Sequence, residues 1–240
     1  MIPVQRPPAD SELRELLARC TGSVVKKGAD SAAATSVWGS SRAAKREIRA
    51  RLHRMAPAIQ RCMYCLDSQG TDIDHFQPKA LAPLRTFDWL NHLLACSYCN
   101  SNVKREEYPC DEETGECLLL DPSTDDPASH LALLPASGTY EGLTAKGRKT
   151  IVVFDLNREV LRRGRVRMYR LCRDLLPVWH AKVLLGDLEG AGETAMTLRE
   201  EPFGDVLRAL CRRAHTPAVA ELTYGRMLGP ALHAWRHQEA

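Results

Sequence analysis

Residues 62–104 contain most of the chemically informative side chains of this chain and read CMYCLDSQGTDIDHFQPKALAPLRTFDWLNHLLACSYCNSNVK. Two Cys-x-x-Cys pairs enclose an Asp-His dipeptide, and the four cysteines are Cys62, Cys65, Cys96 and Cys99. Such tight pairs suit thiolate ligation better than disulfide geometry, and Zn²⁺ takes four ligands in a closed tetrahedron. We therefore expect a structural zinc site that clamps the intervening segment at its base. Zinc alone does not establish an enzyme, because a zinc module can serve folding only.

The segment inside the clamp predicts the order strand, loop, strand, helix. Residues 71–76 alternate like a short strand that ends before Pro78. Residues 92–96 form the second strand, and Ser97 caps a helix over residues 97–106.

Asp74 and His75 are neighbours on the first predicted strand, so their side chains start on opposite faces. Both reach one phosphate only if the strand twists or ends there, and Pro78 makes such an ending plausible. Asp72 shares the face of Asp74 and is a lesser candidate for a metal ligand.

The pair Asp74-His75, followed by Asn91 and then by Asn100 nine positions later, resembles the ββα-metal fingerprint of the HNH endonucleases. The resemblance implies one divalent ion, Mg²⁺ or Mn²⁺, held by Asp74 and Asn100. It also implies that His75 is the general base, and that Asn91 ties the loop together and orients the histidine.

General chemistry agrees with these roles. A titratable histidine is a natural base near neutral pH, and a hard cation stabilises charge that develops on a phosphate. Carboxylate and amide oxygens suit that cation, whereas the four thiolates suit zinc, so the two metals are separated by ligand chemistry. Lys79, Lys104 and Arg105 are the candidate nucleic-acid contacts around this site.

Composition sets limits on the partners. The chain has 240 residues, of which 44% are hydrophobic and 26% charged, as in a globular protein. Lys and Arg number 33 against 30 Asp and Glu, a net charge of +3, so nucleic-acid contacts should rely on local patches. The start has no apolar signal segment, and no apolar run reaches the roughly 18 residues of a membrane span. We expect a cytoplasmic protein without membrane contact.

The predicted fold class is α+β, with a small ββα-metal core and a four-cysteine zinc site embedded in a mainly helical body. Residues 1–60 form an N-terminal helical region, residues 61–108 the core, and residues 109–240 a mainly helical C-terminal region with a short hairpin. The other predicted elements follow apolar periodicity and turn residues. They are an extended start (1–10), a helix from Asp10-Ser11, a loop with partial helix (22–36), a basic helix (39–60), a strand (117–122), a hairpin (130–142), a helix (144–157), an arginine-rich helix (158–176), a loop (186–192), and two helices (203–236) broken near 216–217 and 229–230.

The likeness extends beyond the core, over roughly residues 3–176, to a subfamily that includes the HNH subunit of Septu-type antiphage defence, also found beside some retrons. His75-Phe-x-Pro-Lys79, Trp89-x-Asn91 and Leu120-Asp-Pro122 carry it. It implies a companion ATPase, and this chain shows no phosphate loop of its own. DNA is the expected substrate and RNA the alternative.

Two rival functions stay open from the sequence. One is a stand-alone HNH nuclease of the restriction type, and the other is a non-catalytic zinc-ribbon protein that binds nucleic acid. The arginine-rich helix is by default a basic face exposed to solvent. The alternative is that this face binds the nucleic-acid backbone or an acidic partner.

Overall fold

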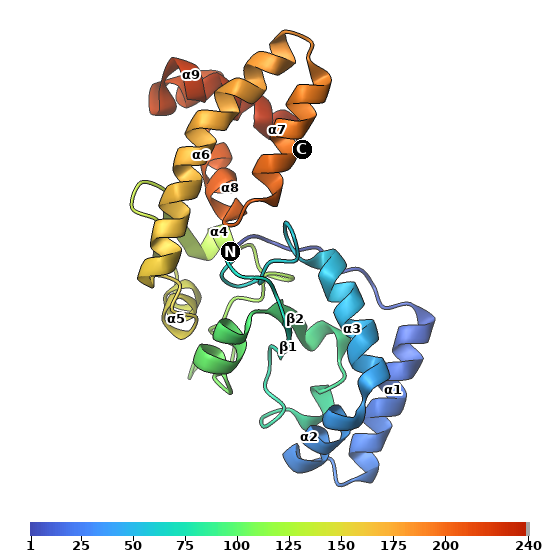
Figure 1. The fold of residues 1–240 in the computed structure, drawn as a ribbon. Coiled ribbons are helices and arrows are strands. Elements are labelled where there is room, and N and C mark those ends of the chain that lie inside the picture. The colour runs from blue at the N-terminus through green and yellow to red at the C-terminus, as the bar shows by residue number, and fades with distance from the viewer. Residues whose placement is uncertain (239–240) are drawn as a thin grey trace.

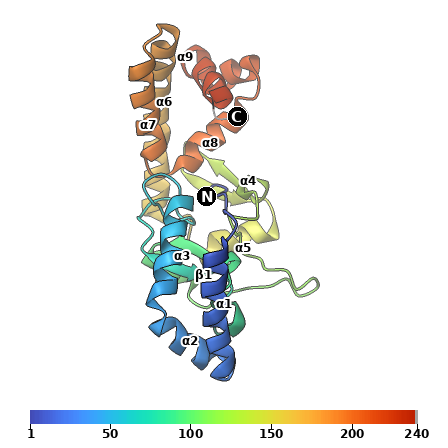
Figure 2. The ribbon, with the colours of Figure 1, turned by 90° about the vertical axis from the view of Figure 1, so that its right-hand side faces the viewer.

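The computed structural model describes residues 1–238 and has the expected α+β class, with many helices and two small antiparallel sheets. The molecule is elongated (Figure 1). One end holds the first three helices and the first sheet, and the other end holds the last four helices. The second view shows the same division (Figure 2). No helix among the described residues is long and apolar enough to cross a membrane.

The N-terminal part is three helices preceded by an extended segment, residues 1–10. They are α1 (Ser11–Lys26), α2 (Ser31–Ser40) and α3 (Arg42–Met55). Asp10 begins α1 as predicted, since its carboxylate accepts from the amide of Leu13 at 2.8 Å. The predicted loop over 22–36 is wrong for its first residues, because α1 continues to Lys26 and Val24 packs in the core.

The predicted basic helix over 39–60 corresponds mainly to α3. Its buried stripe contains Ile48, Leu52 and Met55, as expected, whereas Ile59 lies beyond its end and is exposed. The helix ends at Met55, two residues before Pro57, because the residue before a proline disfavours helical geometry.

The central segment has the predicted order of strands. Strand β1 (Asp72–His75) pairs antiparallel with β2 (His92–Ala95), with His75 opposite His92. Between them lie the 3₁₀ turns η1 (Pro83–Arg85) and η2 (Trp89–Asn91). The following element, η3 (Tyr98–Lys104), is a π-helix rather than the predicted capped α-helix, and Ser97 makes no side-chain capping bond.

Residues 117–153 connect the core to the C-terminal helices and differ from the prediction at one element. Residues 117–122 were predicted as a strand but pair only at Cys117, and the amide of Leu120 bonds the Thr150 hydroxyl instead. After α4 (Pro127–His130), the predicted hairpin is present as β3 (Leu131–Leu134) and β4 (Thr139–Gly142). The predicted helix is present as α5 (Ala145–Val153).

The remaining helices pack on one another. They are α6 (Glu159–Leu184), α7 (Leu188–Glu200), α8 (Gly204–Arg213) and α9 (Pro217–Gln238). Helix α6 continues past the predicted end at Leu176 because its buried face continues to Trp179, whose ring lies 4.9 Å from that of Trp235 on α9.

Two predicted breaks are wrong in this region. The loop over 186–192 is mostly the first turn of α7, which Asp187 caps by accepting from the amide of Gly190 at 3.0 Å. Pro230 lies inside α9, and the kink is at Gly225, whose φ of 78° only glycine adopts freely.

Candidate metal centre and active site

The four predicted zinc ligands come together in the structure. Cys62 and Cys65 lie on the turn after α3, Cys96 follows β2, and Cys99 is on η3. Their sulfur atoms all lie within 4.8 Å of one another, and all four residues are buried. The amide of Met63 donates to the carbonyl of Leu94 at 2.9 Å, which ties the first Cys-x-x-Cys turn to β2.

The electrostatics of this cluster favour a cation. Burial raises the pKa of the Cys62 thiol well above its usual value, and contacts with the other three thiols raise the pKa of Cys99. Hydrogen bonds from neighbouring thiols, Cys62 first, lower the pKa of Cys65 and of Cys96, so the four thiols do not ionise together without a cation. Four thiolates at such distances repel one another in the absence of a positive ion, and a coordinated metal reverses that preference. The tetrahedral demand of Zn²⁺ and four closely spaced sulfurs agree, so the cluster can hold a metal such as zinc.

Asp74 is buried and both of its carboxylate oxygens have protein partners. Tyr64 donates to Oδ2 at 2.5 Å, and the ammonium of Lys104 lies 3.0 Å from Oδ1. Lys104 also donates to the carbonyl of His75 at 2.7 Å. The ion pair therefore fixes the end of β1 to the last turn of η3.

His75 lies at the end of β1, buried against aromatic rings. Its Nε2 is 3.1 Å from the carbonyl of Thr86, and a carbonyl only accepts, so Nε2 carries the proton and Nδ1 has the free lone pair. Trp38 meets the imidazole edge-on at 4.4 Å. Burial, the neighbouring His92 and Lys79 lower the pKa of His75 to about 2, so the ring is neutral at ordinary pH.

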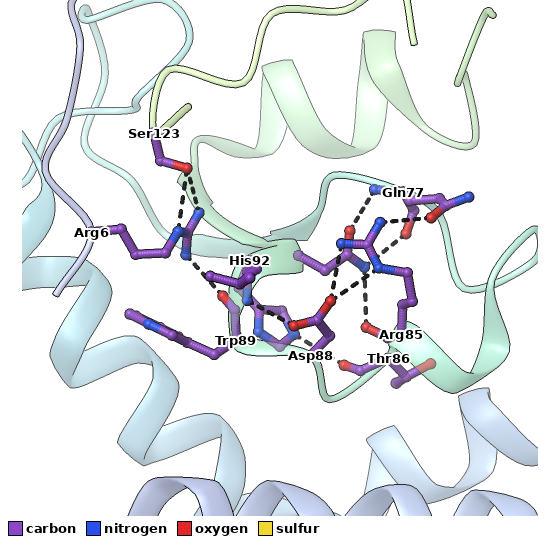
Figure 3. Close-up of polar contacts among 10 residues, drawn as sticks. Arg6, Gln77, Arg85, Thr86, Asp88, Trp89, His92 and Ser123 are labelled. Carbon is purple, nitrogen blue, oxygen red and sulfur yellow. Dashed lines mark hydrogen bonds and ion pairs between the residues drawn. The ribbon is translucent and has the colours of Figure 1, made fainter. Parts of the chain in front are cut away.

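Asn91 holds together the loop that separates the two strands. Its amide nitrogen donates to the carbonyls of Gln77 and Arg85, and its oxygen accepts from the amide of Gln77 at 2.8 Å. Arg85 directly precedes Thr86, the partner of His75, so Asn91 fixes the segment that orients the histidine. Figure 3 shows the bonds around Gln77, Arg85 and Thr86.

Asn100 is on η3, and its side-chain nitrogen donates to Asp72 at 3.1 Å. The strand ends at His75, and both Asp74 and His75 line one pocket of about 310 Å³ together with Asn100. Asp74 and His75 therefore border one pocket although they are neighbours on the strand. Asp72, the lesser candidate, does not line this pocket and bonds Asn100 instead.

The three predicted nucleic-acid contacts differ in exposure. Lys79 and Arg105 line the same pocket, and Arg105 is exposed. Burial lowers the pKa of Lys79, and the nearby Asp74 and Glu106 oppose that shift. Lys104 has no exposed surface and is bound to Asp74, so the predicted phosphate contact does not fit this geometry.

Tyr64 and Thr86 escaped sequence reasoning, and His92 was expected only as the first residue of the second strand, where the structure has it. Tyr64 and Thr86 contact the two central side chains but carry no pattern of their own, since Tyr64 is only the middle of a cysteine pair. His92 stands next to Asn91 and shares the Thr86 carbonyl with His75, at 3.0 Å from its own Nε2. Its place opposite His75 follows from the strand register, which a sequence alone does not give.

Arg6 from the extended start also supports the site. Its guanidinium donates to the carbonyl of Trp89 at 2.8 Å and to Ser123 at 2.9 Å, as Figure 3 shows. The indole of Trp89 donates to the carbonyl of Pro7 at 2.9 Å. Residues 1–10 therefore join the loop before β2 to the connection that follows the core.

Comparison with known proteins gives a partial match to a curated protein. The chain is 28% identical over 137 residues to the Septu protein PtuB of Bacillus mycoides (strain KBAB4). The match covers 45% of this chain, which spans about half (46%) of the relative's length. No family model and no solved structure matches the chain. Over the matched segment the chain is similar to a Septu protein.

Proposed function

We propose that the protein is a metal-dependent HNH endonuclease that hydrolyses phosphodiester bonds, with DNA as the first candidate substrate. The single observation that carries the proposal is the shared pocket, which is lined by His75, Asp74 and Asn100. The strands and η3 have the order that the HNH resemblance implies.

His75 suits the role of general base in this pocket. The Thr86 carbonyl fixes the proton on Nε2, which leaves Nδ1 as the group that takes a proton from water. Its low pKa keeps the ring neutral, and a buried neutral base becomes stronger where an anionic phosphate approaches and stabilises the imidazolium.

The oxygen donors fit a divalent cation in part. Each carboxylate oxygen has two lone pairs, so Asp74 retains one on each oxygen beside Tyr64 and Lys104. Asn100 donates through nitrogen, and its side-chain oxygen is the second hard donor. Mg²⁺ keeps several waters and needs only one or two protein ligands, so Asp74 and Asn100 would hold it. The ion would supply charge stabilisation at the scissile phosphate.

A non-catalytic zinc protein that binds nucleic acid is the second candidate, and one observation favours it. Lys104 already neutralises Asp74, so a cation at this carboxylate meets a positive charge next to it. In this alternative the pocket residues serve the fold, and the protein binds nucleic acid without cleaving it.

A plasmid-cleavage assay separates these two functions. The intact protein should cut DNA with Mg²⁺ or Mn²⁺ and lose activity in EDTA. His75→Ala should lower cleavage by about 10²–10⁴-fold, the usual contribution of a general base, while zinc content stays unchanged. His215→Ala is the matched control, because His215 is exposed, lies between α8 and α9 and does not line the pocket. Undiminished cleavage by His75→Ala would refute the mechanism.

We further propose a role in antiphage defence beside an ATPase subunit, which the likeness to a Septu protein supports. A stand-alone restriction-type nuclease is the alternative. Affinity purification from the native host should recover a large ATPase with this chain at fixed stoichiometry. Recovery of the chain alone, with cleavage that needs no partner, would favour the stand-alone enzyme.

A further inference from the structure

A hollow lined by arginines lies on the first turns of α6, away from the pocket of His75. It measures about 920 Å³, and the turn of the β3–β4 hairpin, at Ala136 and Ser137, forms its other wall. The arginines that line it are Arg162, Arg163, Arg167 and Arg170. This hollow shares no lining residue with the pocket of His75.

The positive charge of this hollow is largely uncompensated. Arg163 pairs with Glu159 at 3.6 Å, but both side chains are 81% exposed, so the pair contributes little. Within residues 1–238, Arg162, Arg167 and Arg170 form no ion pair with a carboxylate. Glu159 is the only acidic residue among those that line the hollow.

The adjacent hollow on the same helix is different. It is lined by Arg61, Arg167 and Arg170, and these three arginines meet three carboxylates, those of Asp67, Asp174 and Glu201. The hollow against the hairpin turn, with four arginines and one carboxylate, therefore has the larger excess of positive charge of the two.

We propose that this hollow binds the phosphodiester backbone of nucleic acid and anchors the substrate outside the catalytic pocket. The proposal rests on the nuclease function inferred above, since it names a second contact with the same substrate. Arginine favours this ligand because its planar guanidinium binds phosphate oxygens in pairs. The hollow has no aromatic or large aliphatic anchor beyond Val166, which protein interfaces usually have.

The spacing of the arginines fits a phosphate track. Arg163, Arg167 and Arg170 follow one another by four and three residues, so they lie along one face of α6. Seven residues of helix span about 10 Å at about 1.5 Å per residue, which matches about three steps of one DNA strand at about 3.4 Å each.

The hollow is also mechanically linked to the core. Tyr98, at the start of η3, donates to Asp155 at 3.1 Å, and the guanidinium of Arg158 lies 4.1 Å from its ring. These two residues closely precede α6, and η3 also carries Asn100 of the pocket. A nucleic-acid strand bound at α6 would therefore have a fixed position relative to the pocket of His75.

The test measures binding in the His75→Ala protein, so that the probe is not consumed. A fluorescent DNA duplex of about 20 base pairs, enough to span two helical turns, is titrated at salt concentrations between about 50 and 200 mM, with the matching RNA duplex as a second arm. The variants are Arg167→Glu and Arg170→Glu. The control is Arg173→Glu, which makes the same charge change at an exposed residue of α6 outside the hollow.

Arg167→Glu and Arg170→Glu should each weaken binding at least tenfold and should make the salt dependence shallower by about one unit of slope, as expected for one lost phosphate contact. Arg173→Glu should stay within twofold of the parent. Equal weakening in Arg173→Glu would reduce the effect to net charge and overturn the proposal, as would unchanged binding in all variants. If polyglutamate competes as well as DNA at equal charge concentration, the surface recognises acidic protein instead, and the proposal is overturned.

The failure of this inference is distinguishable from that of the nuclease function. In proteins that keep His75, the variants of Arg167 and Arg170 should raise KM while kcat stays within twofold. Normal cleavage with unchanged KM overturns the role of the hollow alone. If these two variants lose binding but neither the parent protein nor any variant cleaves DNA, the nuclease function alone is overturned.

Discussion

Lys104 and Asp74 form an ion pair that has almost no contact with water, with side-chain exposures of 0% and 2%. The Tyr64 hydroxyl and the His75 carbonyl occupy further hydrogen-bonding positions around it. A buried pair adds little net stability, but removal of one member leaves an uncompensated charge. These residues therefore act as a unit that positions η3 against β1.

Lys104→Met should destabilise the protein by about 3–5 kcal/mol, the usual cost of breaking a buried pair. Urea unfolding at neutral pH measures the loss. Lys79→Met is the control, because Lys79 is only partly buried and its loss should cost far less. Asp74→Asn in the Lys104→Met background should recover part of the stability, and no recovery would mean that the two residues do not act as a pair.

His92 should make stability depend on pH. Burial lowers its pKa from an ordinary 6.5 to about 4. Above pH 6.5 the His92 ring is neutral in both the folded and the unfolded protein. Below pH 6.5 the unfolded chain binds a proton at His92, whereas the folded protein does so only near pH 4. Stability should therefore fall from pH 6.5 toward pH 4, by up to about 3 kcal/mol from this residue.

Urea midpoints measured between about pH 7 and pH 4.5, a range that covers most of this titration, check the prediction. His92→Gln keeps an N–H donor for the Thr86 carbonyl but cannot take the proton, so its midpoint should vary less with pH. The cysteine cluster is common to both proteins, and only the difference between their pH profiles is informative. Parallel profiles would show that His92 does not titrate on unfolding.

The elements found from sequence are those whose signal is local. The alternation over residues 71–76 and the turn residues near 135–138 predicted β1 and the β3–β4 hairpin. The helix after β2 was predicted, but as an α-helix. The π-helical form of η3, whose last residue Lys104 pairs with Asp74 thirty residues earlier, has no local signal in the sequence. Helix α7 was missed because its glycines were given more weight than its apolar stripe at Ala191, Ala195 and Leu198.

The candidate site shows the same limit. The cysteine pattern alone was enough to predict the thiol cluster. That His75 and Asp74 share a pocket depends on where β1 ends, and the Thr86 carbonyl reaches His75 only because Asn91 closes the loop. Such backbone partners have no side-chain signature, so sequence reasoning could not name them.

The segment from Cys110 to Cys117 contains a testable pair. The amide of Leu118 donates to the carbonyl of Pro109, and that of Asp111 to Glu116, so Cys110 and Cys117 form the non-hydrogen-bonded pair between them. Such pairs have Cα atoms about 4.5 Å apart, within the range of a disulfide.

Oxidised glutathione should convert this pair to an intramolecular disulfide and release two molecules of reduced glutathione. Intact mass should fall by about 2 Da, and peptide mapping should join the two cysteines. Cys110→Ser should abolish the product, whereas Cys20→Ser should not. Stable mixed disulfides with glutathione at both positions would contradict the register.

At the scale of the whole molecule, stability comes from two different sources. The cysteine cluster is built from the turn after α3, the end of β2 and the start of η3. In the same part of the chain Trp38 packs against His75, and Trp89 bonds Pro7. Helices α6 to α9 pack mainly on one another (Figure 1). The ring of Trp179 on α6 lies 4.9 Å from that of Trp235 on α9. The free energy of zinc binding stabilises the folded form of the part that holds its ligands.

A zinc chelator should therefore unfold the first part and leave the second helical. Trp38→Phe/Trp89→Phe retains only Trp179 and Trp235 as emitters, and the reciprocal variant retains only Trp38 and Trp89. Chelation should shift the emission of the variant that retains Trp38 and Trp89 to longer wavelength, because water reaches these two indoles. The emission of the variant that retains Trp179 and Trp235 should change little. Zinc addition should reverse the shift. Equal shifts in both variants would mean that the contact of the Phe203 amide with the Leu66 carbonyl, at 3.1 Å, couples the two parts into one cooperative unit.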